Sequence, residues 1–229
     1  MQLFYLESLE EKIKLNTAES RHITKVLRKK EGDVLSFTDG KGFLYKAKII
    51  DLNNKNCIVK VINRNQNKKQ HNYYLHIAIA PTKNLDRFEW FLEKSTEIGI
   101  DEITPVICNN SERKVIKTQR SKRILLSAMK QSLKYHLPKI NESISLNEFL
   151  KKDIDGAKYI AHCKKINRNQ LEEERKKKKT LILIGPEGDF TNEEINLALQ
   201  NNFKSISLGK SRLRTETAGI IATHIINIK

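Results

Sequence analysis

Residues 180–209 read TLILIGPEGDFTNEEINLALQNNFKSISLG, which is a strand, a turn, a helix and a second strand in succession. The first strand (180–185) is apolar after Thr180, as strands buried on both faces of a parallel sheet are. Thr191 and Glu194 have the spacing of a capping box, which predicts a helix over 192–202. A second strand follows at 205–209. Such a unit favours a parallel sheet covered by helices.

The same alternation continues on both sides of this unit. Each further strand is rich in β-branched and apolar residues, and Gly99 ends the first helix. Strands are predicted over 73–80, 102–108 and 158–163, and helices over about 86–98, about 117–135 and from about 215 onward. The charge run 171–179 is interpreted as a solvated helix face or loop. The expected fold class for this region is α/β.

The N-terminal region has a different pattern. Short strands are predicted over 34–38, 43–50 and 57–62, after a helix over 17–29 that opens with a capping box of Asn16 and Glu19. The stretch NRNQNKKQHN (63–72) has no large apolar residue and cannot pack into a core. We therefore expect a small β-rich domain over residues 1–70 and an α/β domain over 71–229.

The charge balance favours a polyanionic partner. The chain has 43 Lys and Arg against 27 Asp and Glu, a formal net charge of +16, and its isoelectric point is about 9.7. Nucleic acid is the first candidate, since its phosphates release counterions when cations bind. The alternative is an organism whose proteins are all rich in lysine. Charge alone does not choose between the two.

The cysteines and apolar runs exclude several classes of protein. The three cysteines lie far apart with no CxxC pair, so neither a zinc site nor a disulfide framework is indicated. The first twenty residues contain four glutamates and no continuous apolar segment, which argues against a secretory signal. No apolar run reaches the roughly 18 residues of a membrane helix. We expect a cytoplasmic protein without a metal and without a membrane partner.

Proteins with a parallel sheet bind their ligands beyond the carboxyl ends of the strands. The loops after Cys163, Ile184 and Leu208 are therefore the candidate binding or catalytic sites. The second loop, GPEGDF (185–190), has two glycines that permit a tight turn and close approach by a ligand. It matches no phosphate-binding pattern, and its two carboxylates would repel phosphate. A ligand with hydroxyls or positive charge fits better. The alternative is an ordinary connection from strand to helix.

The third loop, LGKSRLRTETA (208–218), places three cations between a strand and an apolar helix. Cations at a helix N-terminus oppose the macrodipole and cost some stability. A role in holding RNA phosphate or a developing anion would explain them, and a solvent-exposed basic turn is the alternative. Among the scattered histidines, His162 stands out because it ends a central strand.

Five segments together resemble the RsmE family of SPOUT methyltransferases. They are LRKKEGD (27–33), EKSTEIGI (93–100), QSLKYHLPKI (131–140), LILIGPEGDFT (181–191) and LGKSRLRTETA (208–218). The pair GPEG with LG…LRTETA is far more specific than either alone. The resemblance implies a PUA-like RNA-binding barrel, a C-terminal domain with a trefoil knot, and a homodimer. It also implies methylation of N3 of a uridine in small-subunit (16S) ribosomal RNA with S-adenosylmethionine as cofactor.

The resemblance carries site residues with it. The cofactor would lie against Ala161, His162, Ile184, Gly185, Glu187, Gly188, Leu208, Gly209 and Leu213. Arg214, Glu216 and Thr217 would face the target uridine. RNA would be held by Arg21, His22, Lys25, Arg28, Lys94 and Lys134. Two positions depart from the family pattern, which commonly has a glycine where Asp189 stands and an arginine where Lys134 stands.

The implied reaction is an in-line methyl transfer from a sulfonium to uracil N3, which must first lose its proton. A cation beside the uracil oxygens would stabilise the resulting anion, and Arg214 is the leading candidate. Glu187 or Glu216 could accept the proton. Two alternatives stay open: a SPOUT enzyme that methylates a ribose 2′-hydroxyl, and a non-catalytic RNA-binding factor of ribosome assembly.

Overall fold

The chain divides into two compact units. A computed structural model describes residues 2–8, 10–164, 168–174 and 177–228. The N-terminal unit comprises residues 1–69 together with 129–137, and the C-terminal unit comprises 70–128 and 138–229. The segment 129–137 thus belongs with the N-terminal unit, although it lies within the range 71–229 that the sequence predicts for the second domain.

The N-terminal unit is built on a five-stranded sheet in the order β1-β3-β4-β5-β2. Its strands are β1 (Leu3–Tyr5), β2 (Lys12–Lys14), β3 (Val34–Thr38), β4 (Phe43–Asp51) and β5 (Ile58–Gln66). Fully buried side chains such as Phe37, Ile49 and Val59 form its core. Strand β5 runs four residues beyond the predicted end at 62, because its polar part pairs through the backbone with the start of β4.

The helix of this unit is shorter than predicted. Asn16 caps it as expected, with its Oδ1 accepting a 2.9 Å hydrogen bond from the backbone N–H of Glu19. The α-helix α1 (Thr17–Arg21) passes into a π-helical turn, η1 (His22–Val26). The expected end at 29 is wrong because Arg28 takes a left-handed conformation, with φ of 49°, which a helix cannot contain.

Among its described residues, the C-terminal unit contains an eight-stranded sheet in which every strand pair is parallel. The order is β11-β13-β10-β12-β6-β7-β8, with β9 also paired to β7. The strands are β6 (Tyr74–Ile79), β7 (Glu102–Ile107), β8 (Lys139–Ile140), β9 (Ile144–Ser145), β10 (Ala157–Ala161), β11 (Asn169–Gln170), β12 (Lys179–Ile184) and β13 (Lys204–Ser207). The α/β class is confirmed.

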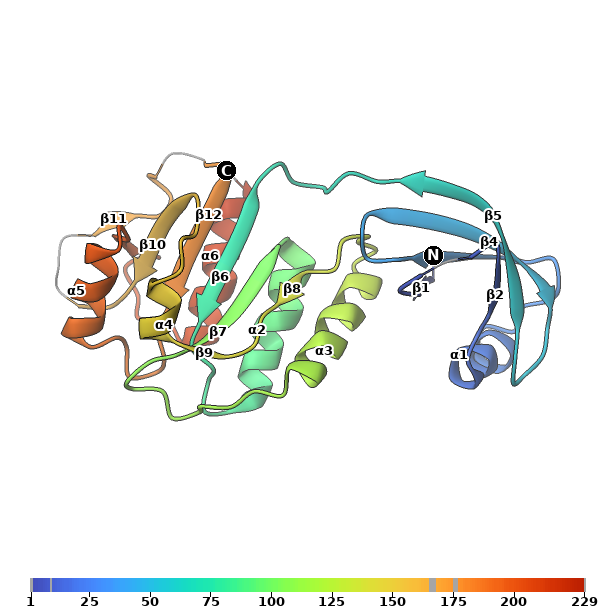
Figure 1. The fold of residues 1–229 in the computed structure, drawn as a ribbon, viewed down its shortest axis with the longest axis horizontal. Helices are drawn as coiled ribbons and strands as arrows, with labels where there is room; N and C mark the ends of the chain where they lie inside the picture. Colours follow the sequence, from blue (N-terminus) through green and yellow to red (C-terminus); the bar gives the residue numbers. More distant parts are fainter. Residues whose placement is uncertain (1, 9, 165–167, 175–176, 229) are drawn as a thin grey trace. The chain divides into compact units, whose positions relative to one another are not determined.

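Helices cover both faces of this sheet (Figure 1). They are α2 (Leu85–Ile98), α3 (Thr118–Gln131), α4 (Leu146–Leu150), α5 (Asn192–Gln200) and α6 (Thr215–Ile228). On one face α2 packs against α6, where a side chain on Gly219 would come within 2.6 Å of the Phe91 ring. On the other face α4 packs against α5. Helix α3 ends at Gln131 rather than at 135, since Leu133 has a φ of 54°.

Candidate active site

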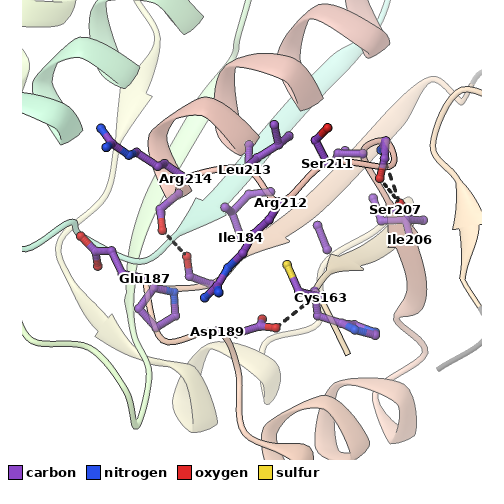
Figure 2. A pocket seen from close by; sticks show the side chains of 18 of the residues that line it. Cys163, Ile184, Glu187, Asp189, Ile206, Ser207, Ser211, Arg212, Leu213 and Arg214 are labelled. Atoms are coloured by element: carbon purple, nitrogen blue, oxygen red, sulfur yellow. Dashed lines mark hydrogen bonds between the residues drawn. The ribbon is translucent and has the colours of Figure 1, made fainter. Parts of the chain in front are cut away.

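A cavity of about 320 Å³ opens at the carboxyl ends of β10, β12 and β13. The three loops that follow these strands form its walls, as the rule for parallel sheets predicts. Figure 2 shows Ile184, Ile206 and Leu213 beside charged side chains from the same loops. Its volume is at the small end of the range typical of cofactor sites, which are mostly apolar with a few polar groups.

The cavity gathers eight of the nine residues expected to hold the cofactor. They are Ala161, His162, Ile184, Gly185, Glu187, Leu208, Gly209 and Leu213. Gly188 lies outside the lining, and a side chain there would come within 3.0 Å of Cβ of Asn110. Close packing against the loop after β7 therefore accounts for this glycine without a ligand. Of the expected uridine-facing residues, Arg214 lines the cavity, whereas Glu216 and Thr217 do not.

The turn 185–189 is held from two sides. Within the turn, the backbone N–H of Asp189 donates a 2.9 Å hydrogen bond to the carbonyl of Pro186. A side chain on Gly185 would lie 3.0 Å from the buried ring of Phe190, so the ring packs where only glycine fits. From outside, Nδ2 of Asn110 donates to the carbonyls of Gly188 and Asp189 at 3.2 and 3.0 Å.

The second wall runs from Ser207 to Thr215. Gly209 adopts a φ of 128°, a conformation that other residues rarely take, and a side chain there would meet nothing within 4 Å. Its carbonyl accepts a 2.9 Å hydrogen bond from the hydroxyl of Ser207. The wall ends where α6 begins, since the hydroxyl of Thr215 donates to the carbonyl of Gly185 at 3.0 Å.

Arg214 and Glu187 lie at one end of the cavity, and Cys163 and Ser207 lie at the other (Figure 2). Oε1 of Glu187 accepts a 3.0 Å hydrogen bond from the backbone N–H of Lys83, which fixes the carboxylate against the loop after β6. The side chain of Arg214 is exposed. A fixed anion and an accessible cation therefore border the same end of the cavity.

Glu216 is placed differently from Glu187. It is only 4% exposed in the first turn of α6. Its Oε1 lies 3.9 Å from Nε of Arg87 on α2, and its Oε2 has no hydrogen-bond partner among the described residues. Because a helix N-terminus favours a carboxylate, α6 itself stabilises the negative charge. Glu216 thus faces α2 rather than the cavity.

His162 carries an unsatisfied nitrogen at the cavity wall. The residue is 4% exposed, and its Nε2 lies 3.0 Å from the hydroxyl of Ser205. Its Nδ1 is buried without a hydrogen-bond partner among the described residues. Burial lowers the pKa of the imidazole, and the nearby Arg168 lowers it further. A buried polar atom of this kind is costly unless paired, so it suits a hydrogen bond to a bound ligand.

The residues expected to hold RNA divide between the two units. Arg21, Lys25 and Arg28 are exposed on the N-terminal unit, where His22 is half-buried with its ring edge-on to Phe4. Lys134 also belongs to that unit. Lys94 is on α2, and its ammonium lies 2.8 Å from Glu93 and 3.0 Å from Glu97, so two carboxylates already neutralise it.

Ten residues that the sequence does not predict also line the cavity. They are Cys163, Arg168, Pro186, Asp189, Ile206, Ser207, Ser211, Arg212, Thr215 and Ala218. Most of them are next in sequence to a predicted site residue in one of the three loops. Their position beside that residue is the feature of the sequence that could have revealed them. Arg168 has no such neighbour, because it comes from the segment after β10 that shows no regular pattern. In Figure 2, Arg212 lies centrally beside Ile184.

Comparison with known proteins assigns the family. A family model described as an RNA methyltransferase domain matches residues 68–227, and one described as an RNA methyltransferase PUA domain matches residues 15–62. A protein from Rickettsia conorii called ribosomal RNA small subunit methyltransferase E is 31% identical over 226 residues, which cover 95% of this chain and 91% of that one. The chain belongs to the ribosomal RNA small subunit methyltransferase E family. The expected PUA domain and the resemblance to the RsmE family are confirmed.

Solved structures agree with this membership. A probable rRNA methyltransferase from Porphyromonas gingivalis has a TM-score of 0.94 and 40% identity, covering 100% of this chain and 99% of its own. A ribosomal RNA small subunit methyltransferase E from Neisseria gonorrhoeae, bound to S-adenosylmethionine, has a TM-score of 0.86 and 28% identity, covering 97% and 95%. Membership in this family thus extends over both units of the chain.

Metal-binding clusters and membrane-spanning helices are both absent from the described residues. No group of three or more His, Cys, Asp and Glu side chains among them is arranged to hold a metal ion. No helix within the described ranges is long and apolar enough to cross a membrane.

Proposed function

We propose that this protein transfers the methyl group of S-adenosylmethionine to N3 of a uridine in small-subunit ribosomal RNA. The observation that carries the proposal is the cavity at the ends of β10, β12 and β13, which brings together the two motif loops 185–190 and 208–218. Family membership indicates the class of reaction and the class of RNA. The choice of S-adenosylmethionine as cofactor is supported by the similar protein from Neisseria gonorrhoeae, whose structure contains it.

The cavity suits the cofactor chemically. Ile184, Leu208 and Leu213 offer apolar contacts for an adenine ring, and the unpaired Nδ1 of His162 offers a polar contact. While it is ionised, before it takes up a proton, the carboxylate of Glu187 would attract the positively charged sulfonium as the cofactor binds. Bound there, S-adenosylmethionine would supply an electrophilic methyl group for in-line displacement, which requires an aligned nucleophile and no metal.

Arg214 and Glu187 have the chemistry that uracil N3 demands. Loss of the N3 proton builds negative charge on the uracil oxygens, and a guanidinium held beside them stabilises this charge. Glu187 is a better proton acceptor than Glu216, because it lines the cavity beside Arg214 whereas Glu216 is buried against Arg87. The proton therefore passes from N3 to a carboxylate oxygen of Glu187 before the methyl group arrives.

Three further properties of the family complete the proposal. A trefoil knot in the C-terminal unit would hold the cavity loops, and a homodimer would cover exposed apolar residues. Trp90 on α2 and Ile228 at the end of α6 are 46% and 64% exposed. The N-terminal unit would hold RNA through Arg21, Lys25 and Arg28. Light scattering of the wild type and of Trp90→Glu tests the dimer, since a charge in an apolar interface should produce monomers.

Nucleoside analysis tests the proposed reaction. The protein is incubated with S-adenosylmethionine labelled on the methyl group and small ribosomal subunits from cells lacking this modification. We expect the label in 3-methyluridine. Label in a 2′-O-methylated nucleoside would support the ribose alternative instead. Tight RNA binding without any cofactor binding would support the non-catalytic assembly factor.

A further inference from the structure

We propose that Asp189 is a positioning residue that shapes the cofactor cavity by tying the loop after β10 to the turn after β12. This inference rests on the proposed function of the cavity. Asp189 lines the cavity in the turn after β12. Its carboxylate can accept hydrogen bonds from neighbouring backbone, which a glycine at this position could not do.

Both carboxylate oxygens of Asp189 bind backbone N–H groups. Oδ2 accepts a 2.8 Å hydrogen bond from the N–H of Cys163, the residue that follows His162 at the end of β10. Oδ1 accepts a 2.8 Å hydrogen bond from the N–H of Phe190. The first bond joins residues 26 positions apart in the chain. Hydrogen bonds with a charged acceptor are about twice as strong as neutral ones.

The backbone of Asp189 is in a conformation that favours glycine. Its φ is 62°, and four non-glycine residues among the described ones have positive φ. Of these four, only Asp189 lines the cavity. Aspartate and asparagine tolerate this region better than other side chains. Glycine would relieve the conformational cost, and the carboxylate offsets that cost by holding the neighbouring loop.

The turn does not need the carboxylate for its own shape. Asn110 already fixes the carbonyls of Gly188 and Asp189 from the loop after β7. Removing the side chain of Asp189 should therefore leave the turn in place and release the N–H of Cys163. The affected wall is the one that contains Ala161, His162 and Cys163.

The consequence is a defined contribution to cofactor affinity. If the carboxylate holds this wall in its binding geometry, its loss adds an ordering cost to cofactor binding. Arg214 and Glu187 lie at the other end of the cavity, so the chemical step is spared once the cofactor is bound (Figure 2). The effect should therefore appear in the KM for S-adenosylmethionine and not in kcat.

The test compares Asp189→Gly and Asp189→Asn with Asn202→Gly. Asn202 has a φ of 66° and is exposed away from the cavity, so its replacement matches the backbone change without touching the wall. For Asp189→Gly we expect about 10-fold weaker binding of S-adenosylmethionine by calorimetry, with kcat within about twofold. Asparagine retains one acceptor for the N–H of Cys163 and should restore most of the affinity. The control should bind as the wild type does.

Hydrogen exchange of the Cys163 amide, measured without cofactor, gives a readout independent of activity. We expect faster exchange in Asp189→Gly and wild-type exchange in Asn202→Gly. Wild-type cofactor affinity in Asp189→Gly would overturn the proposal, as would equal weakening by the control. A wild-type protein that binds no S-adenosylmethionine would overturn the proposed function, whereas the exchange data would still report the bond between Asp189 and Cys163.

Discussion

The hydroxyl of Thr215 donates a 3.0 Å hydrogen bond to the carbonyl of Gly185. This bond connects the two most characteristic motifs of the chain, because Gly185 opens the turn after β12 and Thr215 begins α6. Both residues are buried. The first turn of α6 and the floor of the cavity are therefore fixed to each other by a hydrogen bond within the protein, which needs no bound cofactor or RNA.

Thr215→Val should destabilise the fold and loosen the cavity. Valine has the shape of threonine without the donor, so the buried carbonyl of Gly185 loses this partner at a cost of about 1–3 kcal/mol. Urea denaturation should show this decrease in the free energy of unfolding, together with weaker binding of S-adenosylmethionine. Thr215→Ser retains the hydroxyl and serves as the control. Equal stability of the valine variant and the wild type would show that the bond contributes nothing.

His76 should make the stability of the protein depend on pH. Burial lowers its pKa from 6.5 to about 4. The unfolded chain takes up the proton below about pH 6.5 and the folded chain only near pH 4, so protonation favours unfolding in this window. The free energy of unfolding should fall by about 1.4 kcal/mol for each pH unit as the pH decreases through it.

Urea denaturation of the wild type and of His76→Gln at pH 7 and about pH 5 measures this contribution. The variant should lose most of the decrease, because glutamine does not titrate. His224→Gln replaces an exposed histidine and controls for the general loss of an imidazole. If the wild type and His76→Gln lose the same stability between the two pH values, the decrease has another source.

Local sequence patterns predicted the helices and strands that depend on interactions between residues close together in the sequence. The capping box of Thr191 and Glu194 is present, and Asn16 caps α1 through the backbone N–H of Glu19, since each contact needs only a side chain three residues from its partner. The second half of the box expected at Asn16 is absent, because the Glu19 carboxylate accepts from the side-chain amide of Asn16 and not from its backbone N–H. Apolar runs predicted β6, β7, β10, β12 and β13 of the parallel sheet, whereas the two-residue strands β8, β9 and β11 are too short to give such a pattern. The short helix α4 was missed, because its five residues are stabilised by packing against α5 and not by a long periodic pattern.

Contacts between residues far apart in the sequence are the part of the site that the sequence does not predict. The motif loops predicted the cavity and nine of its lining residues, namely eight expected cofactor contacts and Arg214, because the carboxyl ends of parallel strands meet at one edge. The bond between Asp189 and Cys163 joins two loops whose relative position depends on the order of the strands. The motif alone predicts Gly188 as a cofactor contact, whereas in the structure Gly188 packs against the side chain of Asn110.

Arg21 and Lys25 should contribute to RNA affinity by binding phosphates. Both are exposed, and neither pairs with an acidic side chain among the described residues. Removing one cation that neutralises a phosphate should reduce the slope of log K against log salt concentration by about 0.7 to 0.9. Arg21→Gln and Lys25→Gln are measured by salt titration of RNA binding. Lys60→Gln is the control, since Lys60 already pairs with Glu11 at 3.2 Å. A slope that stays at the wild-type value in both variants would argue against this surface.

Arg214→Ala should slow methyl transfer far more than it weakens binding. Removing one preorganised donor to a developing anion typically reduces turnover by about 10²–10³-fold. The affinity for S-adenosylmethionine should stay within a few-fold, because the cofactor contacts of the cavity come mainly from other residues. Arg214→Lys should restore little, since an ammonium lacks the planar fork of the guanidinium.

Lys210→Ala provides the matched control for Arg214. Lys210 is an exposed cation of the same loop that does not line the cavity, so its loss changes the charge of the loop without changing the site. Single-turnover rates at saturating RNA separate a role in chemistry from a role in binding, because replacing a residue that only binds phosphate weakens affinity but leaves the rate normal. If Arg214 is catalytic, the single-turnover rate of Arg214→Ala should be low and that of Lys210→Ala should equal the wild-type rate. If both variants react at nearly the wild-type rate at saturating RNA, Arg214 has no role in the chemical step and is only part of an exposed basic turn.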